Sequence, residues 1–492
     1  MRNTLFLVFT FLLLSKATHA RVLEDTLTHS YVEAGAMAST SGYSPLWFQS
    51  LQYGAVPYQG ATGIVKGYYG KNYFVPTKAY QKAKKYDWKY GVEAVAFGGK
   101  ENDIRIIQAF VAGRSKHWEL WMGRKKELIG LGDSTLSSGF WTFSGNALPP
   151  VKIHFGTLDY LDLFKGWVGV QMQYSDGLQD NFGPVIGALL HQKSLYGRIG
   201  KRKSKFNFFG GLNHNVSWAG ERKSVNGVQG EQFPSNFATY FYVVTALKDR
   251  SLMEIDPNST SDDTGNQYGN HLGSADIAIQ FQDKKLGRFM LYKQTPYETG
   301  RLASLTTAND GITGLSWKIN KRLPINHLVF EYVYTANQGN YKSGITEFLG
   351  WRDPHLIEVE TYYNNTHGPW AYYGKGLGNP LLPIDRESAY QFGEGFAFSK
   401  CATKAYYVGV GGTLAENLSY VFRGSISRYT WPRNHLFPRI TNEEMEPQTA
   451  WSFQVNGAYK KSYTWSAQIG YNQGYRLQNA LGLMVSVRKD LF

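Results

Sequence analysis

The sequence predicts an all-β protein, a transmembrane outer-membrane β-barrel of about 18 antiparallel strands with one short helix near the N-terminus. Three observations predict it. The chain begins with an export signal, no run of 18 or more apolar residues follows that signal, and apolar and polar residues alternate in many later segments. The second observation excludes a helical membrane span. Export combined with period-two strands over more than 400 residues is typical of outer-membrane barrels.

The first residues have the organisation of a secretory signal peptide. Arg2 precedes an apolar run, Leu5–Leu14, and a small-residue cleavage site that ends at Ala20. We therefore divide the chain into a signal peptide, residues 1–20, and one barrel domain, residues 21–492. No low-complexity linker divides the second part, and no cysteine comes directly after the signal, so we expect no lipid anchor at the mature N-terminus.

The composition fits a wall that is apolar outside and wet inside. Aromatic residues make up 15% of the chain, glycine contributes 53 residues, and the mean hydropathy is −0.36. A secreted β-helix or β-sandwich enzyme could share this composition. The single cysteine, Cys401, allows no intramolecular disulfide.

Charge indicates the class of partner. The formal charge of +14 falls by two when Arg2 and Lys16 leave with the signal. A basic exported protein favours acidic glycans, lipopolysaccharide phosphates or anionic solutes as partners, and nucleic acid is not expected.

Five segments show the alternation most clearly. The last two predict a hairpin around a turn at residues 461–462. Dividing about 470 mature residues by roughly 22–26 residues per strand and connection gives about 18 to 20 strands, with a lumen wide enough for water unless something fills it. The apolar positions are Ala275, Ile277, Ile279 and Phe281; Leu328, Phe330, Tyr332 and Tyr334; Leu418, Tyr420, Phe422 and Ile426; Trp451, Phe453, Val455, Gly457 and Tyr459; and Trp465, Ala467, Ile469 and Tyr471.

The C-terminal segment predicts a final strand. Apolar residues alternate from Leu481 to Val487, but Phe492 falls on the polar parity, so we expect a slight bulge near Lys489 or Asp490. A terminal aromatic residue is what the barrel-insertion machinery typically reads, which makes that machinery an expected partner.

One segment near the N-terminus predicts a helix. Ser44 is placed as an N-cap, Pro45 as the first helical residue and Gly54 as the stop. We expect a short helix or tight connection on the periplasmic side, after the first strand.

Three loops rich in turn residues, around 256–274, 361–395 and 430–449, are assigned to the cell exterior. Sugar rings pack on aromatic faces flanked by amides and charged groups, and two of these loops concentrate such side chains. An alternative interpretation is that the aromatic residues anchor the barrel at the membrane interface. The candidate polysaccharide-binding residues are Tyr362, Tyr363, Asn364, Asn365, His367, Trp370, Tyr372, Tyr373, Trp431, Arg433 and His435.

Basic clusters occur at residues 82–85, 124–126 and 201–205 and suit anionic partners, phosphate headgroups or water. Arg124 and Glu119 are candidates for lumen or structural charges. Arg124 could pair with Glu119 or Glu93, because buried charges in a barrel interior usually come paired.

Several stretches, in order and spacing, resemble the capsule-assembly Wzi family, in the longer form typical of Bacteroidetes-like bacteria. The resemblance covers nearly the whole mature chain. The stretches are Pro45–Phe48 with Gln52–Gly54, Glu119–Lys125 with Gly130–Asp133, Ser144–Ala147 with Pro150, Leu190–Tyr196, and Tyr362–Asn365 with Gly368–Gly374 and Leu377–Leu381.

The resemblance implies an outer-membrane barrel of about 18 strands that acts as a surface lectin. Family members help exported capsular polysaccharide stay attached to the cell surface and have no enzymatic activity. The sequence departs from the enterobacterial members, which carry a periplasmic helical bundle, because residues 21–60 offer only one short helix. A second departure concerns the ligand: the specificity of members outside the enteric group is less defined, so the expected partner is an acidic capsular polysaccharide or another exopolysaccharide.

Enzymatic signatures are mostly absent. The sequence contains no phosphate loop, HExxH, nucleophile elbow or CxxC, and its 11 histidines are not spaced as metal ligands, so we expect no metal or other cofactor. An anion-preferring diffusion porin is the second interpretation. A barrel enzyme acting on lipid or glycan is the third, because a Ser–His arrangement is spatial and has no fixed order in the chain.

Overall fold

A computed structural model describes residues 28–76, 84–181, 183–223, 230, 232–247, 268–298, 307–339, 360–365, 367–385, 398–433, 440–459 and 462–491. The predicted signal peptide, Phe492 and His435 lie outside these residues. No helix in this part of the chain is long and apolar enough to cross a bilayer.

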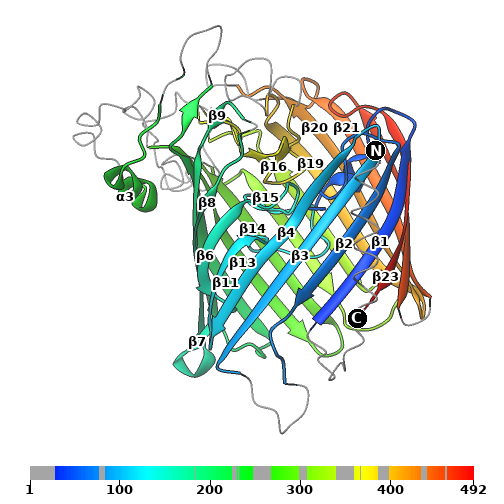
Figure 1. The fold of residues 1–492 in the computed structure, drawn as a ribbon, viewed down its shortest axis with the longest axis horizontal. Coiled ribbons are helices and arrows are strands. Elements are labelled where there is room, and N and C mark those ends of the chain that lie inside the picture. The colour runs from blue at the N-terminus through cyan, green and yellow to red at the C-terminus, as the bar shows by residue number, and fades with distance from the viewer. Residues whose placement is uncertain are drawn as a thin grey trace, which may run out of the picture.

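The chain forms a closed antiparallel β-barrel of 18 strands, which confirms the predicted fold class. Strands follow one another around the wall in chain order, and β1 pairs with β23 to close it (Figure 1). The short β7 continues the line of β6, since both pair with β8. The strands are β1 (Thr28–Ser39), β2 (Thr62–Lys71), β3 (Tyr86–Gly99), β4 (Asp103–Ser115), β5 (Trp118–Arg124), β6 (Val151–Thr157), β7 (Leu161–Leu163), β8 (Val168–Leu178), β10 (Leu189–Ile199), β11 (Phe206–Trp218), β13 (Asn270–Asp283), β14 (Gly287–Tyr297), β15 (Gly311–Lys318), β16 (His327–Tyr334), β19 (Ala402–Ala415), β20 (Leu418–Thr430), β21 (Glu446–Tyr459), β22 (Tyr463–Gly474) and β23 (Ala480–Asp490).

Few other elements occur among the described residues. Two small sheets pair β9 (Val185–Ile186) with β12 (Glu221–Arg222), and β17 (Ala371–Tyr372) with β18 (Lys375–Gly376). The helices are α2 (Leu46–Gln49), α3 (Phe237–Thr245) and a 3-10 turn, η1 (Phe164–Gly166).

The two ends of the barrel differ. The start of β1 and the end of β23 lie side by side, since Tyr31 pairs with Asp490, and we call this the terminal end. Short connections such as 416–417 join strands there. The opposite end, the loop end, carries long connections, including 40–61 and 125–150. Because outer-membrane barrels have short periplasmic turns and longer extracellular loops, the loop end is the exterior end.

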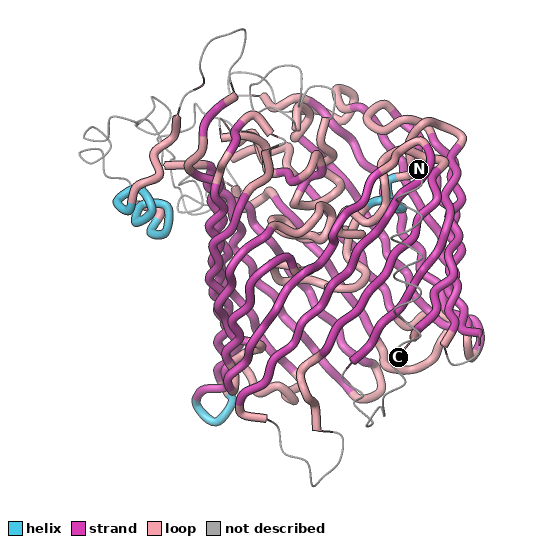
Figure 2. Tube along the Cα trace, in the orientation of Figure 1, coloured by secondary structure: helices cyan, strands magenta, loops and turns pink. Residues whose placement is uncertain are grey.

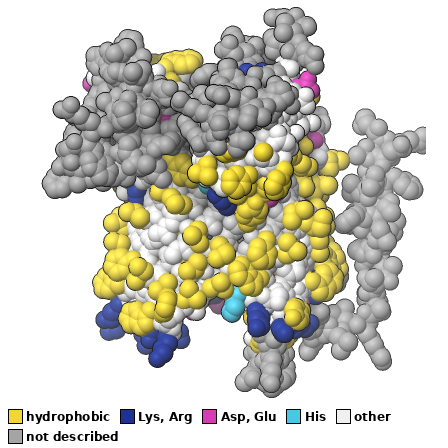
Figure 3. Space-filling model, turned by 90° about the vertical axis from the view of Figure 1, so that its left-hand side faces the viewer, with side chains coloured by type: hydrophobic (Ala, Val, Ile, Leu, Met, Phe, Trp, Pro, Cys, Tyr) yellow, Lys and Arg dark blue, Asp and Glu magenta, His cyan; other side chains and the backbone are white. Residues whose placement is uncertain are grey.

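Alternating side chains line the two faces of the wall, as the sequence predicted. In β13 the exposed Ile277 and Ile279 face outward, whereas Asp276, directly before Ile277, is buried and faces the lumen, where it accepts the backbone N–H of Leu131. Leu483 and Val485 of β23 are exposed in the same way. On the face that Figure 3 shows, apolar side chains gather across the wall, with Lys and Arg at its lower rim. A lipid bilayer is the environment that suits such a band.

Three connections fold back from the loop end into the barrel, and we call them the lumen plug (Figure 2). One buried apolar cluster joins Trp47, Trp141 and Trp370 of the plug to wall residues of β3, β4, β10, β13 to β16, β19 and β21. Since these strands are distributed around the barrel, the plug spans its cross-section. The lumen plug consists of residues 40–61, 125–150, 360–365 and 367–385.

Polar residues on the lumen face of the wall hold the plug. The Glu331 carboxylate of β16 accepts a hydrogen bond from the backbone N–H of Ser138 at 2.6 Å. The Gln294 side-chain carbonyl of β14 accepts one from the backbone N–H of Trp141 at 2.8 Å. Glu331 lies between the predicted apolar positions Phe330 and Tyr332, so the alternation places it on the inward face, and the structure shows that it contacts the plug.

The predicted helix exists, but its start, length and position differ from the prediction. It spans only Leu46–Gln49, and Ser44 does not cap it, because the Ser44 hydroxyl donates to the carbonyls of Pro57 and Tyr58. The helix lies in the plug at the loop end, not on the predicted periplasmic side. The first connection turns into the lumen because its apolar residues, Trp47 among them, are buried there.

The bulge expected near the C-terminus is not present. The ladder between β1 and β23 stays regular through Lys489 and Asp490, which pair with Val32 and Tyr31. The outer connections predicted at 361–395 and 430–449 do leave from the loop end, although the described part of the first turns into the barrel.

Candidate ligand-binding site at the loop end

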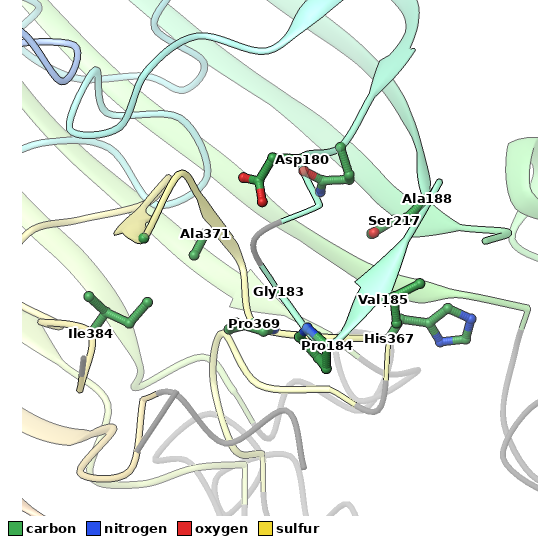
Figure 4. A pocket seen from close by; sticks show the side chains of 13 residues that line it. Asp180, Gly183, Pro184, Val185, Ala188, Ser217, His367, Pro369, Ala371 and Ile384 are labelled. Atoms are coloured by element: carbon green, nitrogen blue, oxygen red, sulfur yellow. The ribbon is translucent and has the colours of Figure 1, made fainter. Parts of the chain in front are cut away.

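A small pocket with an internal volume of about 40 Å³, partly open to solvent, lies at the loop end (Figure 4). One side is the connection from β8 to β10, including Asp180 and Pro184. The other side is the plug segment from His367 to Ile384, and Ser217 of β11 also lines it.

Turn residues bring the two sides together. Gly368 has φ 106°, a conformation that favours glycine, and a Cβ there would lie 3.2 Å from the ring of Pro184. The β8–β10 connection is held in turn by the pairing of β9 with β12. These contacts fix the width of the pocket between Pro184 and the plug.

The pocket carries both donors and acceptors. The Asp180 carboxylate accepts a hydrogen bond from the backbone N–H of Tyr373 at 2.5 Å. The side-chain carbonyl oxygen of Gln179 is buried and has no hydrogen-bond partner among the described residues. Burial lowers the pKa of His367 to about 3, so its imidazole is neutral at physiological pH. The pocket wall therefore contains a carboxylate, an amide oxygen with no partner among the described residues, and an uncharged ring.

An aromatic side chain and a cation lie beside the pocket. Tyr373 is 48% exposed, unlike its neighbour Tyr372, which is buried. The Arg124 guanidinium lies 5.8 Å and 5.9 Å from the ring centroids of Tyr372 and Tyr373. It also donates to the carbonyl of Ile106 at 3.0 Å. The sequence predicted separate roles for Tyr373 and Arg124, and the structure brings them together.

Arg124 does not pair with either of the acids proposed for it. Lysines already occupy both carboxylates: Glu119 binds the ammonium groups of Lys89 at 2.7 Å and Lys125 at 2.8 Å, and Glu93 binds Lys126 at 2.6 Å. Glu119 is thus a paired charge on the lumen face, while the Arg124 guanidinium contacts the plug.

Most of the predicted polysaccharide-binding residues are packed inside the plug. Asn365 is only half-buried, and its side-chain oxygen accepts the backbone N–H of His367. Whether these side chains contact a glycan stays a prediction, but in this conformation their role is to pack the plug. The buried ones are Tyr362, Tyr363, Asn364, His367, Trp370 and Tyr372.

Two further predicted residues lie in the connection from β20 to β21. Trp431 is 60% exposed. Arg433 forms an ion pair with Glu444 at 2.9 Å, and its backbone N–H donates to the side chain of Gln338. His435 lies outside the described residues.

Of the residues that line the pocket, only His367 was among the predicted site residues; the polar Gln179, Asp180 and Ser217 were not predicted. A signal was present, because Asn181, Gly183, Pro184 and Gly187 form a cluster of turn residues between two strands. That cluster predicts a loop, but nothing in it predicts which distant segment faces it.

The fold is similar to that of solved outer-membrane proteins. Wzi of Escherichia coli, described as an outer-membrane protein involved in group 1 capsule assembly and a carbohydrate-binding β-barrel, matches with a TM-score of 0.56 at 12% identity over 95% of this chain and 85% of that one. OccK3 of Pseudomonas aeruginosa matches with a TM-score of 0.44 at 7% identity over 95% and 97%. OmpT of Vibrio cholerae matches with 0.37 at 7% over 94% and 97%.

The match to Wzi shows a Wzi-like barrel fold, as the sequence motifs predicted. No model of a protein family and no curated protein sequence matches the chain.

Proposed function

We propose that this protein is a non-enzymatic barrel of the Gram-negative outer membrane that binds capsular or exopolysaccharide at its loop end and helps to hold it on the cell surface. The fold similarity to a carbohydrate-binding barrel supports the proposal. The observation that carries it is the position of the pocket, which lies at the exterior end on top of a filled lumen.

The groups in the pocket suit a sugar. Sugar hydroxyls both donate and accept hydrogen bonds, so they fit the Asp180 carboxylate and the free amide oxygen of Gln179. The exposed ring of Tyr373 offers a face on which a sugar ring can pack. The Arg124 guanidinium beside that ring could bind the carboxylate of an acidic sugar.

Binding of the host's own surface polysaccharide to the purified, detergent-solubilised protein tests the proposal. We expect Tyr373→Ala to weaken binding about tenfold, which corresponds to about 1.4 kcal/mol, because it removes the exposed ring. Tyr86→Ala is the matched control, since Tyr86 is also exposed but lies at the terminal end. No binding by the wild type, together with unchanged surface polysaccharide in a deletion strain, would reject the proposal.

The porin interpretation requires a continuous water path through the barrel. The buried cluster formed by Trp47, Trp141 and Trp370 occupies the lumen in the described part of the chain, which argues for a closed barrel. Single-channel conductance in a planar bilayer separates the two functions. A large, stable, anion-selective current would favour the porin.

A further inference from the structure

Helix α3 lies outside the barrel wall and below the upper rim (Figures 1 and 2). The side chain of Asn236 caps its start by accepting the backbone N–H of Thr239 at 2.9 Å, and Ala246 ends it in the left-handed conformation. From Asn236 to Leu247 the chain contains no charged residue. Such a segment beside a membrane-spanning wall raises the question of what each of its faces contacts.

The wall behind α3 carries polar groups on its outer face. Outward and inward positions alternate along β10, where Gln192 faces the lumen and Lys193 faces outward. Lys193 pairs across the ladder with His214 of β11. Two residues farther along, Leu195 pairs with Leu212, and both are exposed on the apolar band. The polar groups therefore border directly on the lipid-facing surface.

Asp176 of β8 belongs to the same outward patch. Its carboxylate lies 2.9 Å from Nδ1 of His191, which faces outward from β10. Without a cover, this carboxylate, the imidazole rings and the Lys193 ammonium would face acyl chains, which is unfavourable for charged and polar groups.

One face of α3 provides that cover. The Tyr240 hydroxyl donates to the Asp176 carboxylate at 2.8 Å, and the Lys193 ammonium donates to the backbone carbonyl of Val244. Tyr242 and Val243 are buried in an apolar cluster with wall residues of β11. The helix therefore satisfies the polar patch and seals it with apolar contacts.

The opposite face of α3 has no cover among the described residues. Phe237 is 85% exposed and Phe241, one turn later, is 53% exposed, and Leu247 follows on the same stretch. The wall also carries exposed apolar residues on both sides of the polar patch: Leu178, which pairs with Leu189, and Leu212, which pairs with Leu195. Exposed contiguous apolar surface of this kind marks an interaction site.

We infer that α3 is a membrane-embedded lid: it seats in the outer leaflet with Phe237 and Phe241 among the lipid acyl chains and shields the polar patch on the barrel wall from them. The same barrel thus contacts lipid partly through a helix. This inference does not depend on the proposed polysaccharide binding.

Spin labels attached to single cysteines test the inference in the full-length protein, reconstituted into phosphatidylcholine vesicles. Phe237→Cys and Phe241→Cys report on the helix, Leu212→Cys is the matched lipid-facing control, and Lys203→Cys in an exposed turn is the aqueous control. The native Cys401 is buried, so unlabelled wild type sets the background.

We expect both helix labels to resemble Leu212→Cys, with high accessibility to oxygen and an accessibility to a water-soluble nickel chelate several-fold below that of Lys203→Cys. Nickel accessibility equal to that of Lys203→Cys would overturn the inference, because the helix would then lie in water. Low accessibility to both reagents would also overturn it, because a second protein molecule would then cover the helix.

Discussion

Removing one carboxylate of the lumen plug should release the plug from the wall. Asp133 is buried in the plug, and its Oδ2 contacts two residues of the wall. It accepts the hydroxyl of Ser316 on β15 at 2.6 Å and lies 2.7 Å from Nε2 of His327 on β16. Its Oδ1 accepts the backbone N–H groups of Thr135 and Leu136 at 3.0 Å and 2.8 Å. Burial opposes its charge, but the hydrogen bonds from His327 and Ser316 hold the pKa of Asp133 well below its usual range.

We expect Asp133→Ala to lower the free energy of unfolding by about 3–5 kcal/mol. Each hydrogen bond to a charged group contributes about 1.5–3 kcal/mol, and two of them join the plug to the wall. Guanidinium unfolding followed by tryptophan fluorescence measures this loss. Intermittent current in a planar bilayer, absent in the wild type, would report a displaced plug.

The control for this variant is Asp283→Ala. That carboxylate accepts the backbone N–H groups of Lys285 and Leu286 in an exposed turn at the terminal end, so its loss should leave the plug and the current unchanged. If Asp133→Ala unfolds at the same guanidinium concentration as the wild type and carries no current, Asp133 does not hold the plug and the reasoning from its contacts is refuted.

Two further changes test the plug. Trp47→Ala should cost about 3–5 kcal/mol in guanidinium unfolding, because the buried indole packs on Tyr407 and donates to the carbonyl of Ala450; a loss below about 1 kcal/mol would contradict its role as an anchor. Burial raises the pKa of Asp310 from about 3.8 in the unfolded chain to about 7. The protonated carboxyl therefore stabilises the folded state fully below about pH 3.8, and this stability is lost as the pH rises to about 7. The loss is about 1.4 kcal/mol for each pH unit between those two pKa values. Asp310→Asn should therefore remove a decline in stability that the wild type shows between pH 4 and pH 7; an equal decline in both proteins would assign it to another group.

The wall could be predicted from the sequence because alternation reports directly on it. The outward Ile277 is apolar and the inward Asp276 is charged, so the alternation along a strand indicates which residues face the lipid and which face the lumen. The length of the chain then limits the number of strands, and the observed 18 falls in the predicted range of about 18 to 20.

The plug could not be predicted in the same way. Tyr362, Tyr363 and Trp370 look identical in sequence whether they bind a sugar or pack together, and only their burial separates the two roles. The inward polar residues do not predict a plug either, because a carboxylate such as Glu331 could accept hydrogen bonds from water in an open lumen as well as from the backbone of Ser138. The pocket depends on a meeting between Pro184 and Gly368, which are far apart in sequence.

The position of the first connection has a consequence for the order in which the protein assembles. The backbone N–H of Leu46 donates to the side chain of Asn472, 426 residues later, and the Trp47 indole donates to the carbonyl of Ala450, 403 residues later. The barrel closes only when β1 pairs with β23. The partners of Leu46 and Trp47 are therefore made long after the first hairpin. We expect the last strands to pack around the first connection while the barrel closes, so that this segment does not have to enter a closed barrel. Closure should then be a late and slow folding step, because it depends on contacts between residues far apart in sequence.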